Sequence, residues 1–377
     1  MKFRNFAIRL LFFSIPLNTS NDFLLTDVFP VFAICSLYLQ LFSLGLLFIC
    51  SFFDFFCKSK IDSFIFIFLI LLTYGIFISF INSNLYYGIL EFINWTILLT
   101  FFSFNRLSIY QIRNHLLFFI RVLYLILTFK FFIYFFTHVQ VYGSVSHLII
   151  MKLSCLLILP FIYYFSQFLI NYSLLSLFNS FIIAFQIFYT GSVSQNFILF
   201  SFVVYLFVLQ AYPRLIFKYN ALLLVSFFLL MFFLTPLSFY LLNDSHRVLQ
   251  FLELRSRLID FFPFGTGLGY YSLSYDEYYK LFKPYLLELD LYNFLSKLGF
   301  VGIFFFMIIT RIIFRFSFFT FVHYSEFKAL SLTFLAFLIN SLVQTSISSY
   351  IFPLLLVIIS SVYSNLYIIK FKINSTN

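Results

Sequence analysis

Apolar runs of about twenty residues recur along almost the whole chain, and they limit the possible folds more than any other feature. A run of this length is what a helix needs to cross the hydrocarbon core of a bilayer. Inside lipid the backbone must satisfy its own hydrogen bonds, so a spanning segment is either a helix or a strand of a closed barrel. The runs lack the alternation of apolar and polar residues that barrel strands show. The sequence therefore predicts an all-α polytopic membrane protein.

The composition agrees with this fold class. Of the 377 residues, 63% are hydrophobic and 10% are charged, whereas soluble domains are about 45–50% apolar and about 25% charged. The runs predict about 12 transmembrane helices in a single integral membrane domain that covers residues 1–377. The predicted helices cover residues 6–18, 28–53, 63–81, 85–104, 115–136, 148–165, 170–189, 196–211, 221–242, 291–310, 329–345 and 351–369.

The positions of Lys and Arg predict the orientation, because cytoplasmic loops carry an excess of them. Of the 23 Lys and Arg residues, 14 lie at the two termini and in alternate short loops, so both termini are expected in the cytoplasm. The opposite side carries them only in one long loop, residues 243–290, before the third-last helix. This loop is expected to be extracytoplasmic. Lys130 and Lys152 fall in outward halves of predicted helices, which makes them candidate substrate-binding residues, although long basic side chains also snorkel to the interface.

Two classes of function are not favoured by the sequence. The net charge of +10 could indicate a nucleic-acid-binding protein, but the basic residues are scattered between apolar segments and form no stripe in a polar domain. The four cysteines lack metal-ligand spacing, and we expect free thiols with no metal site and no cofactor.

The long polar loop is the leading place for a functional site. It holds 7 of the 13 acidic residues and five of the basic ones. A helix is predicted from Ser245, as N-cap, to Phe262, ending at Pro263. On that helix His246, Gln250, Glu253, Arg257 and Asp260 share one face, and Glu253 and Arg257 form a favourable i,i+4 pair. The alternative is an amphipathic helix on the membrane whose charges are merely solvated.

Two further features follow this helix. Gly265, Gly267 and Gly269 alternate after Pro263, which permits tight turns and the close approach of a ligand, or forms an ordinary turn. A tyrosine-rich stretch then follows, whose rings either form an interfacial belt or stack on sugars. Glu288 and Asp290 stand where the next helix enters the membrane. A partly desolvated carboxylate there can act as a general base, or can simply complement the helix dipole.

The motifs of this loop resemble those of the bacterial O-antigen polymerase and O-antigen ligase superfamily. The resemblance rests on Arg247, on the segment Pro263–Gly269 and on the segment Asn293–Gly302. Weaker similarities lie in Asn18–Asp27 and in Thr190–Ser194, where Val193 replaces a common arginine. The resemblance implies an enzyme of the bacterial cytoplasmic (inner) membrane that transfers a glycan held on undecaprenyl pyrophosphate. Family ligases carry a histidine near the start of the last motif; residues 288–293 contain none, which favours a polymerase.

The implied reaction gives each candidate a role. Arginines stabilise a departing pyrophosphate, so Arg247 is the first candidate, followed by Arg257 and Arg255. A sugar hydroxyl needs a base, for which Asp290 or Glu288 is the candidate, with His246 behind them. The expected partners are the undecaprenyl-pyrophosphate-linked oligosaccharide and membrane lipid, with a chain-length regulator as a further candidate and no nucleic acid.

Four other functions stay open on the sequence. A ligase would transfer the glycan to lipid A–core. A flippase or other transporter of the same lipid-linked sugars would spread charges through several helices. A metal-dependent lipid-linked glycosyltransferase would place an acidic pair in the first outer loop, where Asp22 and Asp27 stand. A purely structural membrane protein would need none of these residues.

Overall fold

The computed structural model describes residues 2–17, 30–56, 63–142, 154–190, 193–242, 244–270, 289–321, 324–343 and 351–376. All regular secondary structure in these ranges is helical. The elements are α1 (Lys2–Leu17), α3 (Pro30–Phe56), α4 (Ser63–Ile81), α5 (Leu85–Ile93), η1 (Asn94–Thr100), α6 (Phe101–Asn105), α7 (Ile109–Tyr142), η2 (Ser154–Leu157), α8 (Ile158–Asn171), α9 (Leu174–Thr190), α10 (Val193–Ala211), α11 (Pro213–Leu241), α12 (Ser245–Asp260), α14 (Asp290–Leu298), α15 (Phe300–Phe321), α16 (Ser325–Asn340) and α17 (Ile351–Thr376).

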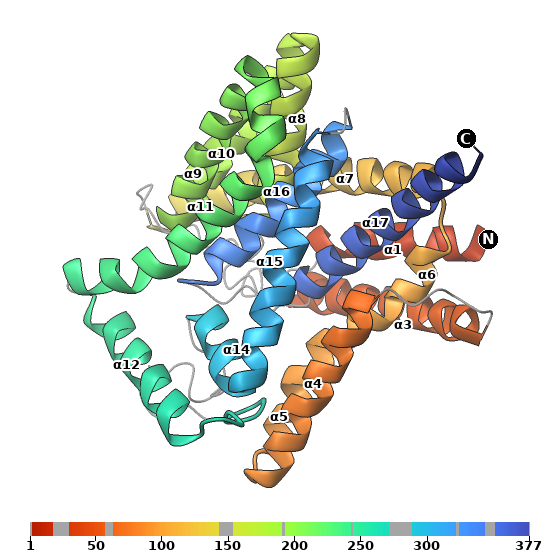
Figure 1. The fold of residues 1–377 in the computed structure, drawn as a ribbon. Helices are drawn as coiled ribbons and strands as arrows, with labels where there is room; N and C mark the ends of the chain where they lie inside the picture. Colours follow the sequence, from red (N-terminus) through yellow and green to blue (C-terminus); the bar gives the residue numbers. More distant parts are fainter. Residues whose placement is uncertain are drawn as a thin grey trace.

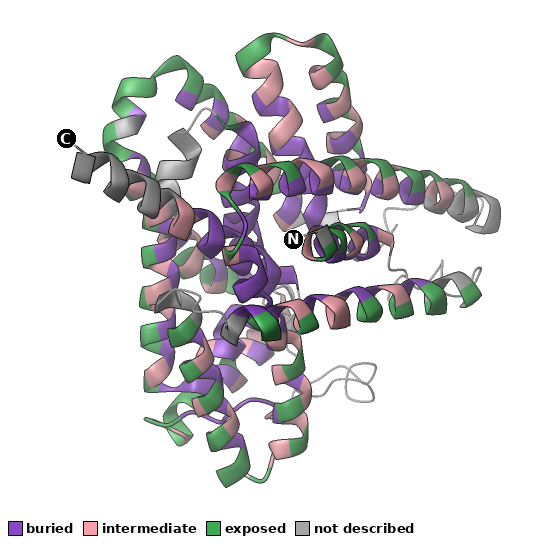
Figure 2. Cartoon of the chain, turned by 90° about the vertical axis from the view of Figure 1, so that its right-hand side faces the viewer, coloured by how far each residue is buried: buried purple, intermediate pink, exposed green. Residues whose placement is uncertain are grey.

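Five of these helical stretches are long and apolar enough to cross a membrane, and several shorter ones are equally apolar. The five lie at Ile34–Asp54, Leu85–Asn105, Ile109–Ile133, Ser194–Ala211 and Lys218–Leu241. Large apolar side chains are exposed along their outer faces, where lipid would cover them. Figure 2 shows the buried positions concentrated where the helices cross and the exposed positions on the outlying helices.

The helices form three groups. One group contains α1, α3, α6, α7 and α17, and a second contains α8, α9, α10 and α16; these two meet where α16 packs against α17. The third contains α4, α5, α12 and α14, which lie in the lower part of Figure 1, and α15, which runs from them through the centre of that view. Both termini lie on the right-hand side of that view, whereas α12 lies at its far left. The polar helix α12 is therefore remote from both ends of the chain.

Most predicted helices agree with the observed ones to within a few residues, but one prediction was wrong in kind. The segment 291–310 was expected to be a single spanning helix. The structure divides it at Gly299 into the short helix α14 and the longer helix α15. Gly299 has a φ of 57°, and a β-carbon there would lie 2.4 Å from the backbone nitrogen of Gly265. The break thus depends on a residue without a side chain, because another chain segment passes against it.

The predicted helix 148–165 was also placed too early. Helix α8 runs from Ile158 to Asn171, and residues 143–153 lie outside the described ranges.

Candidate functional site

Helix α14 presents a buried polar face at the centre of the candidate site. Asp290, Asn293 and Lys297 are spaced so that they share one side of this helix, and all three are buried. Its other side carries Leu291, Phe294 and Leu298, which belong to the hydrophobic core. The short helix therefore holds polar groups inside the molecule instead of turning them toward solvent.

Lys297 forms a buried ion pair with Glu91 of α5. The ammonium nitrogen lies 2.9 Å from Oε1 and 2.8 Å from Oε2 of Glu91. The two side chains are 0% and 2% exposed, respectively. The backbone N–H of Gly269 donates a further hydrogen bond of 2.8 Å to Glu91 Oε2. Because buried charges are stable only when paired and hydrogen-bonded, this pair ties α14 and the glycine segment to α5.

Arg257 of α12 reaches the same face of α14. It forms an ion pair with Glu253 and a 3.3 Å hydrogen bond from Nη1 to Oδ1 of Asn293. Its guanidinium also lies over the ring of Tyr270, 4.8 Å from the ring centre. Asp290 lies one turn before Asn293 on the same side of α14 and is buried as well. We call the six residues of this group the α14 cluster: Glu91, Glu253, Arg257, Asp290, Asn293 and Lys297.

The glycine segment, residues 263–270, packs between α14 and the α4–α5 hairpin. The N–H groups of Gly267 and Leu268 donate to the carbonyl oxygens of Lys297 and Gly75, at 3.0 and 3.1 Å. The hydroxyl of Ser79 donates to the carbonyl of Leu268, and the amide of Asn82 donates to that of Thr266. These bonds satisfy a loop backbone that would otherwise be buried without partners.

The three predicted ligand-binding glycines all have a φ near +80°, at 81° for Gly265, 81° for Gly267 and 77° for Gly269. A β-carbon at Gly267 would lie 2.5 Å from the backbone nitrogen of Ser79, and one at Gly269 would lie 2.1 Å from that of Gly88. Packing alone therefore requires glycine at these positions, since protein backbone fills the space that a side chain would need. Their contact with a substrate stays a prediction.

A hydrogen bond also ties α14 to α11. The hydroxyl of Tyr292 donates to the carbonyl oxygen of Phe232. In an uninterrupted helix that carbonyl would accept the N–H of residue 236, but Pro236 stands there and has none. Tyr292 thus satisfies the backbone group that the proline leaves open, in an apolar helix where water is not at hand.

The predicted polar face of α12 is largely buried, which counts against the alternative of merely solvated charges. Gln250 and Arg257 are buried and Arg257 contacts α14, while Asp260 on the edge of the face is exposed. The i,i+4 pair of Glu253 and Arg257 is confirmed. The N-cap is Asp244 and not Ser245, because the carboxylate of Asp244 accepts the N–H of Arg247. The helix ends at Asp260, two residues earlier than predicted.

The other candidates divide into three sets. Arg247 is half-buried and pairs with Asp244 at 2.6 Å at the start of α12, about 15 Å along the helix from Arg257, and Arg255 is exposed on the same helix. Lys130 is buried in α7, which packs mainly against α1, α8 and α17 and so belongs to a different part of the molecule. Glu288, Lys152 and the side chain of His246 lie outside the described residues, as do Asp22 and Asp27.

Two members of the α14 cluster were missed as functional candidates. Glu91 stands in a predicted spanning helix, 85–104, and Lys297 stands near the start of another. Ionisable residues within apolar helices are functional candidates by default, with a partner to be named. That rule was applied to Lys130 and Lys152 but not to the oppositely charged pair, whose members are 206 positions apart in the chain.

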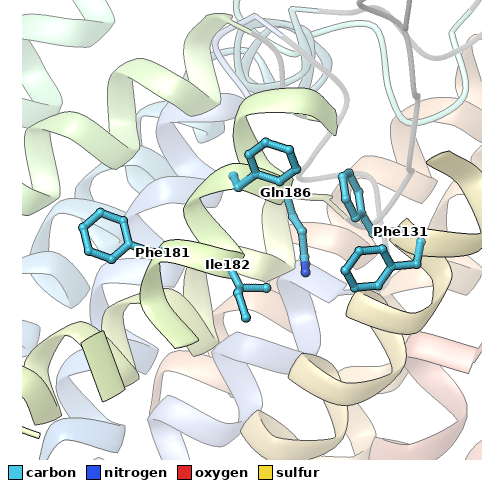
Figure 3. A pocket seen from close by; sticks show the side chains of 6 residues that line it. Phe131, Phe181, Ile182 and Gln186 are labelled. Atoms are coloured by element: carbon cyan, nitrogen blue, oxygen red, sulfur yellow. The ribbon is translucent and has the colours of Figure 1, made fainter. Parts of the chain in front are cut away.

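A separate cavity of about 370 Å³ lies between α7 and α9. Phenylalanines and Ile182 line it, with Gln186 between them and Phe131 on the far side (Figure 3). Nε2 of Gln186 donates to Thr128 at 2.9 Å, while its Oε1 has no hydrogen-bond partner among the described residues. The cavity is apolar, and it lies on different helices from the α14 cluster.

The α14 cluster combines a buried guanidinium, a buried ammonium and three carboxylates, of which that of Glu253 is partly exposed. Such a site can stabilise anionic charge and can accept a proton. Within the described ranges, no group of three or more His, Cys, Asp or Glu side chains is placed to hold a metal ion. The chain matches no protein-family model, no curated protein and no solved structure.

Proposed function

We propose that the chain is a membrane-embedded glycosyltransferase that polymerises oligosaccharide repeats carried on undecaprenyl pyrophosphate. The observation that supports this most directly is the hydrogen bond from buried Arg257 to Asn293 of α14, the short helix that also carries buried Asp290. Tyr292 of the same short helix bonds to Phe232 of α11, an apolar helix long enough to span a membrane. A lipid-linked diphosphate and a sugar hydroxyl need such a cation and such a carboxylate within reach of each other.

In the proposed reaction, a hydroxyl oxygen of the acceptor sugar forms a bond to the anomeric carbon of the donor glycan. The bond from that carbon to the pyrophosphate oxygen breaks, and the bonding pair leaves with the pyrophosphate. Arg257, with the more exposed Arg247 and Arg255 on the same helix, offsets the charge that develops on the leaving group. Asp290 accepts the hydroxyl proton. Lys297 and Glu91 hold α14 in place.

A second candidate, a transporter of the same lipid-linked sugars, is favoured by one specific observation. The helix expected at 291–310 is interrupted at Gly299, next to the buried pair of Glu91 and Lys297. Interrupted helices with buried charges are typical of transporter binding sites. Both candidates use a lipid-linked diphosphate, and they differ in whether a glycosidic bond forms.

The experiment that separates them is deletion of the gene in its own host, followed by electrophoresis of the surface polysaccharide. A polymerase predicts loss of the ladder with a single repeat retained, whereas a transporter predicts loss of every repeat. Complementation with the Arg257→Gln or Asp290→Asn variant is expected to give the same polysaccharide pattern as the deletion strain. The matched control is Arg214→Gln, an exposed arginine at the opposite end of α11, which should restore the ladder. An unchanged ladder in the deletion strain would refute both functions.

A further inference from the structure

Helix α12 exposes an apolar stripe, although its composition is polar. Leu249, Leu252 and Ile259 are 57%, 43% and 68% exposed, while Gln250 and Arg257 on the opposite side are buried. Ser256 lies within the stripe, and the exposed residues Arg255 and Asp260 flank it on its two sides. Helix α12 also buries Leu254 on its inner side, so the stripe is a second apolar side, which a helix on the surface of a water-soluble protein does not expose.

The stripe continues beyond the helix. Phe262 and Phe264, in the turn that follows α12, are 64% and 62% exposed. Exposed apolar surface of this extent marks a contact with another apolar phase. The helix itself is too short to cross a bilayer: it has 16 residues, and five of its side chains carry charge at neutral pH.

The neighbouring helix identifies the phase that covers the stripe. Helix α11 is apolar enough to span the membrane, and its span ends at Leu241, four residues before α12 begins. Its last turns expose Leu237, Tyr240, Leu241 and Leu242. The exposed apolar end of α11 and the stripe of α12 are therefore close in the chain, since α12 begins four residues after the span ends.

We infer that α12 lies in the membrane–water interface at the point where α11 leaves the bilayer. Leu249, Leu252 and Ile259 face the acyl chains, Arg255 lies at the level of the lipid phosphates, and Asp260 faces water. Helices with one apolar side and flanking charges occupy this position, with the apolar side about 5–10 Å into the headgroup–acyl boundary. This placement does not depend on the proposed function.

The placement is tested with spin labels on single cysteines, in the full chain reconstituted in lipid nanodiscs. The background variant has the four native cysteines replaced by serine or alanine, and a monodisperse preparation with wild-type fluorescence of Trp95 shows that it is folded. Labels at positions 252 and 259 report collisions with oxygen, which concentrates in lipid, and with a nickel chelate, which stays in water. Position 230 on α11 is the lipid control, and position 260 is the water control.

The inference predicts an oxygen-to-nickel collision ratio at 252 and 259 close to that at 230, and a low ratio at 260. The depth calculated from the ratio should fall about 5–10 Å below the phosphates. High nickel access at 252 and 259 would overturn the inference, since the stripe would then be in water. Exclusion of both reagents would overturn it too, because a protein surface would then cover the stripe.

Discussion

The buried pair of Glu91 and Lys297 makes a quantitative prediction about stability. The change is Lys297→Met, which keeps the length of the side chain and removes its charge. Glu91 is then left in the interior, and among the described residues only the Gly269 N–H still donates to it, at 2.8 Å. Removing one partner of a buried ion pair costs about 3–5 kcal/mol, because the remaining charge has lost its water without compensation.

The magnitude is set by burial and geometry. Both side chains are nearly inaccessible, and the ammonium contacts both oxygens of the carboxylate at hydrogen-bond distance. The double variant Glu91→Gln/Lys297→Met removes both charges while the glutamine amide oxygen can still accept the Gly269 N–H. Replacement of a whole buried pair by neutral groups is often close to neutral, so the double variant should regain most of the loss. The coupling energy of the cycle should reach about 3 kcal/mol.

The assay is reversible unfolding in mixed micelles with increasing sodium dodecyl sulfate, followed by tryptophan fluorescence. Trp95 is the one tryptophan of the chain, it is buried, and its ring lies 5.2 Å from that of Phe294 on α14. Its emission therefore reports the separation of η1 from α14, next to the ion pair. A double variant no more stable than Lys297→Met would refute the reasoning, because the cost would then come from packing and not from an unpaired charge.

Two further changes test the loop and the helix contacts. Gly267→Ala is expected to destabilise the protein by more than about 1 kcal/mol, since φ is +81° and the new carbon meets the backbone of Ser79. The matched control is Gly45→Ala, in α3 with open space beside it. It should be neutral or stabilising by up to about 1 kcal/mol. Loss of folded protein with both, measured by the same titration, would contradict the argument from φ. Tyr292→Phe should cost about 1–3 kcal/mol because the carbonyl of Phe232 loses its donor, and Pro236→Ala should rescue it by restoring a backbone N–H. An equal loss with and without Pro236 would show that the hydroxyl is not acting on that carbonyl.

The apolar runs predicted an all-helical membrane protein, because hydropathy over about twenty residues depends on local sequence alone. The break at Gly299 could not be predicted in the same way. A glycine in an apolar run is compatible with a continuous helix, and only the passage of residues 263–265 against it explains the left-handed backbone. The burial of Arg257 has a similar cause. Helical periodicity places it with Gln250 and Glu253, but it does not say whether that face meets water or α14.

The pair of Glu91 and Lys297 shows how much of the candidate site could be predicted from the sequence. Each residue could be recognised as a charge inside an apolar helix, but the contact joins segments far apart in the sequence. A single sequence contains no signal that pairs them. The roles of Arg247, Arg255, Arg257 and Asp290 in catalysis stay predictions, of which the variants of Arg257 and Asp290 above test two.

The same pair sets an order of events during synthesis in the cell. Glu91 leaves the ribosome 206 residues before Lys297, an interval of about 10–40 s at translation rates of roughly 5–20 residues per second. During that interval the carboxyl group of Glu91 has entered the insertion machinery, but Lys297, its ion-pair partner, has not yet been made. The nascent α5 is therefore expected to stay near the membrane surface or bound to a chaperone until α14 arrives. A chain released before residue 297 should then be a substrate for membrane proteases, although most of its apolar helices have already been made.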